Sequence, residues 1–180
     1  MRADAKRNRE RIVSCALDLF AERGPGVSME EIARAAGLGV GTLYRHFPDR
    51  RALVEEIATS SLRCLGAEIR RLREQELPRW EVLTRVVAFC AGQPFALVKA
   101  VADGDSPPEE RLALQDEVDG LLRELMQEVQ EAGAMRDDIS PVEAVEILST
   151  AVCRPGARED DAVTRVMLDG LRAGQRGRGM

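Results

Sequence analysis

The stretch of sequence that decides the fold is GLGVGTLYRHF, which runs from Gly37 to Phe47. Its beginning fits a glycine loop around a cofactor's phosphates, whereas its end fits a short helix. A dinucleotide-binding loop has the pattern G-x-G-x-x-G directly after a β-strand, because the strand leads into a turn that aims helix N–H groups at the pyrophosphate. Here the pattern is G-x-G-x-G and a capped helix precedes it. The sequence therefore favours the short helix.

The residues just before this stretch have the form of a capping box. In Ser28-Met29-Glu30-Glu31 the serine hydroxyl can accept from the Glu31 backbone N–H while the glutamate reaches back, which predicts a helix that begins at Ser28. Gly37 can adopt the left-handed conformation at a helix C-terminus, so this helix is expected to end there. The short helix then fits Val40 to Phe47. Pro48 ends it, because a residue before proline is pushed out of the α region.

A helix, a tight turn and a short second helix make the layout of a helix-turn-helix, whose second helix enters the major groove of DNA. The apolar and aromatic residues of the short helix share one side, which is expected to pack inward: Val40, Leu43, Tyr44 and Phe47. The small and polar residues share the other side, which is expected to face DNA: Gly41, Thr42, Arg45 and His46. Arg45 can reach guanine O6 and N7, and the hydroxyl, phenol and imidazole groups can hold phosphates.

The rest of the chain shows helical spacing of apolar residues and no β-type alternation of useful length. A first helix carries Ile12, Ala16 and Phe20 and stops at Gly24-Pro25-Gly26, and Asp49 caps a long fourth helix that continues towards Pro78. Further helices are expected at Trp80–Ala91, Pro94–Ala102, Glu109–Ala132, Ser140–Val152 and Asp160–Leu171, with a turn at Gly104–Pro108 and a disordered glycine- and arginine-rich tail. The predicted fold class is all-α.

The helix-turn-helix motif resembles the DNA-binding domain of the tetracycline-repressor (TetR) family. The resemblance rests on SMEEIARAAG, residues 28–37, followed by GTLYRHF, residues 41–47, and it covers roughly Arg9 to Leu53. It implies a protein of nine or ten helices, with a DNA-binding domain at 1–51 and an effector-binding and dimerisation domain at 52–175. It further implies a homodimeric repressor that an unidentified small molecule releases from a palindromic double-stranded DNA operator. The alternatives are a regulator controlled by a protein partner, an activator, or a helical enzyme or carrier.

Residue by residue, the resemblance implies a set of DNA contacts. Matches to phosphate-contacting positions are Thr42, Tyr44, His46 and Arg50, the last standing for the usual lysine, and Ser28 is a cap first and a phosphate ligand second. Matches to positions near base edges are Val40, Gly41 and Arg45. The chain departs from the family pattern at Gly39, which leaves the short helix without a side-chain cap. It also departs at Val40, which can contact a thymine methyl but cannot donate a hydrogen bond.

Charge divides unevenly along the chain. Residues 1–51 hold 10 Lys and Arg against 7 Asp and Glu, a balance of +3, and residues 52–180 hold 16 against 24, a balance of −8, which sums to −5. A basic head on an acidic body is expected when only one end of a protein meets a polyanion. The basic residues near the N-terminus form either an arm that reaches DNA or a solvated face: Arg2, Lys6, Arg7, Arg9 and Arg11. The acidic body weakly favours a cationic effector.

The acidic body carries no recognisable catalytic constellation, and its scattered cysteines have no metal-ligand spacing, so we expect no enzyme activity, no cofactor and no metal site. The resemblance implies an effector cavity, whose apolar or aromatic lining also suits a core: Trp80, Phe89, Phe95, Leu122 and Met126. The last two helices offer apolar residues for a dimer interface: Val145, Leu148, Val152, Val163, Val166 and Met167. Without a signal peptide or an apolar run of membrane-spanning length, the protein is expected in the cytoplasm with no membrane partner.

Overall fold

The computed structural model describes residues 2–24, 26–91, 93, 95, 107–154 and 156–174. Within these ranges every named element is a helix: α1 (Arg2–Arg23), α2 (Met29–Ala35), α3 (Val40–His46), α4 (Arg50–Arg73), α5 (Arg79–Ala91), α7 (Glu109–Glu131), α8 (Pro141–Val152) and α9 (Ala162–Leu171). The all-α prediction is confirmed. The helix expected at 94–102, except for residue 95, the first part of the turn expected at 104–108, and the end of the tail lie outside the described residues.

Local capping groups decide where the helices begin. The Ser28 and Ser140 hydroxyls accept from backbone N–H groups at the third position of α2 and α8, and a glutamate at that position completes each capping box. The Asp49 carboxylate accepts from Ala52 N–H at 2.7 Å at the start of α4. At the start of α9 the cap is Asp161, whose carboxylate accepts from Thr164 N–H at 2.8 Å.

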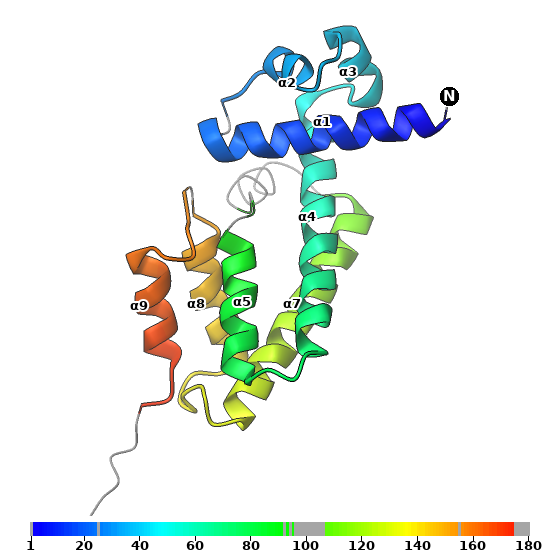
Figure 1. Ribbon diagram of the computed structural model, residues 1–180. Helices are drawn as coiled ribbons and strands as arrows, with labels where there is room; N and C mark the ends of the chain where they lie inside the picture. Colours follow the sequence, from blue (N-terminus) through cyan, green and yellow to red (C-terminus); the bar gives the residue numbers. More distant parts are fainter. Residues whose placement is uncertain are drawn as a thin grey trace, which may run out of the picture.

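The first three helices and the first turns of α4 surround one hydrophobic cluster. Figure 1 shows α2 and α3 on one side of α1, with α4 running from this end of the molecule into the body. The cluster's bulkiest members come from all four helices: Ile12, Phe20, Ile32, Leu43, Leu53 and Ile57, with Phe47 just after α3. Burial of these side chains joins the short helices into one unit, since helices of seven residues are not stable alone.

A second hydrophobic cluster fills the body of the molecule. It takes Leu62, Leu65, Ile69 and Leu72 from the later turns of α4 and continues through α5, α7, α8 and α9. Helix α4 therefore contributes to both clusters, and its two halves belong to different cores. Within the ranges that the structure describes, no helix is both long enough and apolar enough to cross a membrane.

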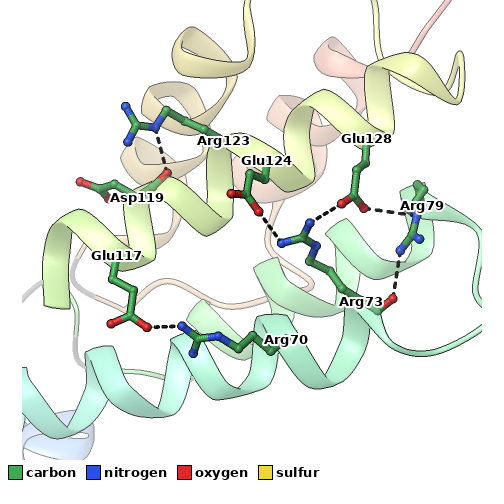
Figure 2. A network of polar contacts seen from close by, with 8 residues as sticks. All are labelled: Arg70, Arg73, Arg79, Glu117, Asp119, Arg123, Glu124 and Glu128. Atoms are coloured by element: carbon green, nitrogen blue, oxygen red, sulfur yellow. Dashed lines mark hydrogen bonds and ion pairs between the residues drawn. The ribbon is translucent and has the colours of Figure 1, made fainter.

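Helices α4 and α7 run parallel and are joined by ion pairs along their exposed edge. The pairs are Arg63 with Glu110, Arg70 with Glu117, and Arg73 with both Glu124 and Glu128. Figure 2 shows that Arg70 and Arg73 of α4 point across to the carboxylates of α7, and that Arg79 of α5 reaches Glu128. Exposed pairs of this kind contribute about 0–1 kcal/mol each, so the apolar core holds the helices together and the ion pairs favour their register.

Candidate functional site

The turn between α2 and α3 is built by a glycine in the left-handed region. Gly37 has φ of 63°, which side chains other than glycine rarely adopt. Its N–H donates to the Arg34 carbonyl at 3.0 Å, and Leu38 N–H donates to the Ala33 carbonyl at 2.9 Å. These two bonds form a Schellman motif, which satisfies the last carbonyls of α2. The chain can then leave α2 sharply and begin α3 at Val40.

The capping box of α2 holds the start of the helix-turn-helix. Glu31 N–H donates to the Ser28 hydroxyl at 3.2 Å, and the Ser28 N–H and hydroxyl both donate to Glu31 Oε2 at 2.9 Å. These bonds, the backbone one first, hold the pKa of the Glu31 carboxyl below its ordinary value. The predicted role of Ser28 as a cap is confirmed, and its second role as a phosphate ligand stays a prediction.

The inner side of α3 is anchored by only two side chains. Leu43 is 0% exposed and Phe47, the residue that follows the last turn, is 1% exposed. At the other end, Gly39 provides no side-chain cap, and its carbonyl accepts from Thr42 N–H at 2.8 Å. The absence of a capping side chain at Gly39 was expected from the sequence and is confirmed.

The outer side of α3 is wider than the sequence predicts. Val40 is 41% exposed and Tyr44 is 42% exposed, although the helical wheel places both on the packed side. That placement is wrong, because α3 meets the core along the narrow line of Leu43 and Phe47 and the residues flanking that line are uncovered. Gly41 and Arg45 are also exposed, as predicted, whereas Thr42 and His46 are half-buried. Arg45 Nη2 donates to the Thr42 hydroxyl at 2.9 Å, so these two side chains already lie together.

The sequence gives no sign of the residue that fixes the end of α3. Arg9 of α1 donates from Nη1 to the His46 carbonyl at 3.1 Å and from Nη2 to Glu56 Oε2 at 2.7 Å. Its guanidinium also lies 4.4 Å from the centroid of the Phe47 ring. These contacts join α1, α3 and α4 at one point. Because α1 is helical from residue 2, the basic residues near the N-terminus do not form an extended arm.

The first residue of α4 contacts the turn before α2. The Arg50 guanidinium donates to the Val27 carbonyl and lies 5.0 Å from the centroid of the Phe20 ring. Arg50 is half-buried in this position. Its side chain therefore holds the base of the helix-turn-helix, and the phosphate contact expected of it stays a prediction.

The body contains an open cavity of about 580 Å³ lined by α4, α5, α7 and α8. Of the five residues expected to line an effector site, Phe95 and Leu122 line this cavity, and Leu122 and Met126 line a smaller one beside it. Trp80 and Phe89 line neither; they pack against the core, and the Arg172 guanidinium lies 5.2 Å from the centroid of the Trp80 ring. Cys90 also faces the main cavity, where burial raises the pKa of its thiol to about 12 and keeps it neutral.

The structure divides the residues expected at a dimer interface into two groups. Leu148 and Val152 are 5% and 7% exposed, because they face the chain's own core, and they are not available to a partner. Val145 is half-buried and lines the cavity. On α9, Val163 and Val166 are 42% and 70% exposed, whereas Met167 is half-buried against the core. Of the six residues expected at the dimer interface, Val163 and Val166 are the two whose side chains are exposed and can contact a partner.

Two protein-family models match this chain. One describes bacterial regulatory proteins of the tetR family and matches residues 12–57. The other describes the C-terminal domain of SbtR-like transcriptional regulators and matches residues 76–173. The first match contains the whole helix-turn-helix, and the second contains most of the helices that surround the cavity.

Known proteins are similar over different parts of the chain. A TetR transcription regulatory protein from Mycobacterium vanbaalenii is 36% identical with a TM-score of 0.67, over 95% of this chain and 98% of that one. A TetR transcriptional regulator from Streptomyces coelicolor is 31% identical with a TM-score of 0.63, over 92% and 98%. An HTH-type transcriptional regulator from Staphylococcus aureus is 38% identical over 84 residues, which are 46% of this chain and 45% of that protein. The match thus spans about half the length of the curated relatives.

Proposed function

Since this chain belongs to the TetR family of DNA-binding transcriptional regulators, a non-enzymatic family, we propose that it is a homodimeric repressor that a small molecule releases from a palindromic operator. In this proposal residues 1–51 bind DNA and residues 52–175 bind the effector and dimerise. Its place of action is the cytoplasm, where bacterial DNA lies.

The observation that carries the proposal is the exposed side of α3. Arg45 is exposed there and is held beside Thr42, while Leu43 fixes the opposite side in the core. An exposed arginine on a short anchored helix can insert between the walls of the major groove and donate to guanine O6 and N7. Val40 and Gly41, at the tip of the same helix, approach the base edges. The residues assigned to phosphates are Thr42, Tyr44, His46, Arg50 and Ser28.

Exposed apolar side chains on α8 and α9 support the proposed dimer. Val142 of α8 is 50% exposed, and Val163 and Val166 of α9 are 42% and 70% exposed. A second copy of the chain that packs on these residues through a two-fold axis covers them and presents two copies of α3 to one face of DNA. Affinity for a palindromic site then comes from two linked half-site contacts.

The position of α4 supports release by an effector. The helix starts beside α3 and lines the cavity at its middle, with Leu62 and Leu65, so a ligand that prefers one position of α4 also selects one position of the DNA-binding helices. Coupling of this kind is typically about 1–3 kcal/mol, or roughly 5–150-fold in DNA affinity. A ligand in the cavity is expected to act within that range.

Binding of purified protein to double-stranded DNA tests the proposal. Genomic fragments that the protein protects should contain an inverted repeat, and the protein should bind this repeat as a dimer. The logarithm of the affinity should fall with the logarithm of the salt concentration by about 0.9 for each phosphate contact, or roughly 5 for a dimer with three contacts in each half. Fluorescence anisotropy measures this slope. The proposal is contradicted if the protein binds the repeat as a monomer, or if its affinity for DNA does not change with the salt concentration.

A further inference from the structure

Among the residues that the structure describes, one buried charged side chain faces the main cavity. Arg111, near the start of α7, is 6% exposed and lines the cavity. The cavity's other charged lining residues among those described are Asp119, Arg123 and Glu146, and none of them is buried. Burial of a guanidinium beside apolar side chains is costly unless its charge and its donors find partners.

Glu55 on α4 pairs with the charge of Arg111 but leaves donors of the guanidinium without hydrogen bonds. The Nε of Arg111 lies 2.9 Å from Glu55 Oε2, but neither atom has the geometry of a hydrogen bond with a partner. Among the residues that the structure describes, Nη2 of Arg111 also has no hydrogen-bond partner. The guanidinium therefore has donors to offer to a molecule that enters the cavity.

The remaining lining indicates what kind of molecule fits. Asp119 accepts from Gln115 Nε2 at 3.0 Å, and Arg123 Nε donates to the Asp119 carbonyl at 3.1 Å, so these polar groups already contact one another at the edge of the cavity. Much of the rest of the lining is apolar: Leu62, Leu65, Phe95, Val118, Leu122 and Val152. A molecule with an apolar body and one negative group is complementary to this arrangement, because a guanidinium can donate two parallel hydrogen bonds to a carboxylate.

We propose that the cavity binds a small organic carboxylic acid with an apolar body, and that Arg111 receives its carboxylate. The volume of about 580 Å³ is in the range of small-molecule sites. This inference rests on the proposed function, since it names the chemical class of the effector. It also replaces the expectation from net charge, because the buried group that faces the cavity is a cation although the body is acidic.

The ion pair between Arg111 and Glu55 connects the cavity to the DNA-binding helices. Glu55 is followed on α4 by Glu56, which binds Arg9, and Arg9 in turn holds the His46 carbonyl at the end of α3. A carboxylate that takes the donors of Arg111 competes with Glu55 and weakens the link between α7 and the first turns of α4. The ligand thereby acts on the part of α4 that packs against α3.

Titration calorimetry of the full chain without DNA tests the inference. The probes are phenylbutyrate, phenylbutanol and phenylbutylamine, which share an apolar body and differ only in the head group. The wild-type protein should bind phenylbutyrate about tenfold or more tighter than the other two, since a hydrogen-bonded ion pair is lost with them. Arg111→Met should remove this preference. Arg70→Met is the matched control, because it breaks another α4–α7 ion pair (Figure 2) at a residue that does not line the cavity, so it should keep the preference.

A second variant gives a result that misfolding cannot imitate. Glu55→Gln leaves Arg111 without its competing carboxylate, so phenylbutyrate should bind several-fold tighter than to the wild type.

The inference is overturned if the amine or the alcohol binds the wild type as tightly as the acid, if none of the probes binds, or if Glu55→Gln weakens binding of the acid. Carboxylate binding that fails to release DNA leaves the inference standing and contradicts the repressor proposal instead. If the amine alone releases DNA, the carboxylate inference is contradicted and the repressor proposal stands.

Discussion

Replacement of Leu43 by alanine is expected to lower the free energy of unfolding of the DNA-binding helices by about 2–5 kcal/mol. Leu43 is 0% exposed and is the only buried residue within α3. Its removal leaves a cavity in the hydrophobic cluster that joins α3 to the other DNA-binding helices, and a seven-residue helix is not stable without such burial. Urea denaturation followed by circular dichroism measures the loss.

Val40→Ala is the control for this prediction, because it shortens another apolar side chain of the same helix. Val40 is 41% exposed, so its replacement should change stability by less than about 0.5 kcal/mol. Leu43→Ala should also lose DNA binding, through unfolding of α3. If the two substitutions cost the same, α3 is not anchored as the structure places it.

The second large effect is expected for Arg45→Ala in DNA binding. Loss of a bidentate arginine–guanine contact costs about 1–3 kcal/mol at each half-site, so a dimer loses roughly twice that. Arg45 is exposed, and its side chain donates a hydrogen bond to the Thr42 hydroxyl on the same exposed helix surface. Its replacement should therefore leave the free energy of unfolding unchanged. Fluorescence anisotropy with the selected operator and with a scrambled duplex measures the loss of preference.

Arg85→Ala is the matched control for charge. Arg85 lies on α5, away from the DNA-binding helices, where it pairs with Glu81 on the exposed surface. Its loss lowers the positive charge by the same amount but should leave the preference for the operator unchanged. If Arg45→Ala and Arg85→Ala lose the same amount of operator preference, that preference depends on the total positive charge and not on the position of Arg45 on α3.

Features that depend on neighbouring residues were predicted well from the sequence. The capping boxes at Ser28 and Ser140 and the left-handed Gly37 are local, because each needs contacts only within a few positions. The burial of Leu43 and Phe47 was also predicted, although the same helical spacing placed Val40 and Tyr44 inward by mistake. The family resemblance added the chemical roles to these positions, and the match of residues 12–57 supports it.

Features that depend on distant residues could not be predicted. Val40 and Tyr44 are exposed because α3 meets the core only along the line of Leu43 and Phe47, and a helical wheel does not show how wide the contact with other helices is. Leu148 lies on an apolar side of its helix, and from the sequence this side can pack either against a partner or inside the chain's own core. The structure shows that it packs in the core. The ion pair between Arg111 and Glu55 joins residues on different helices, and nothing in their local sequence indicates it.

The aromatic rings of α3 test the central claim most directly. Tyr44 and His46 are the chain's single tyrosine and single histidine, so their NMR signals need no assignment. As operator duplex is added, both ring signals should shift or broaden together until one duplex is present for each dimer, and a scrambled duplex should perturb them less. If the operator binds while both signals stay unchanged, α3 is not the surface that contacts DNA.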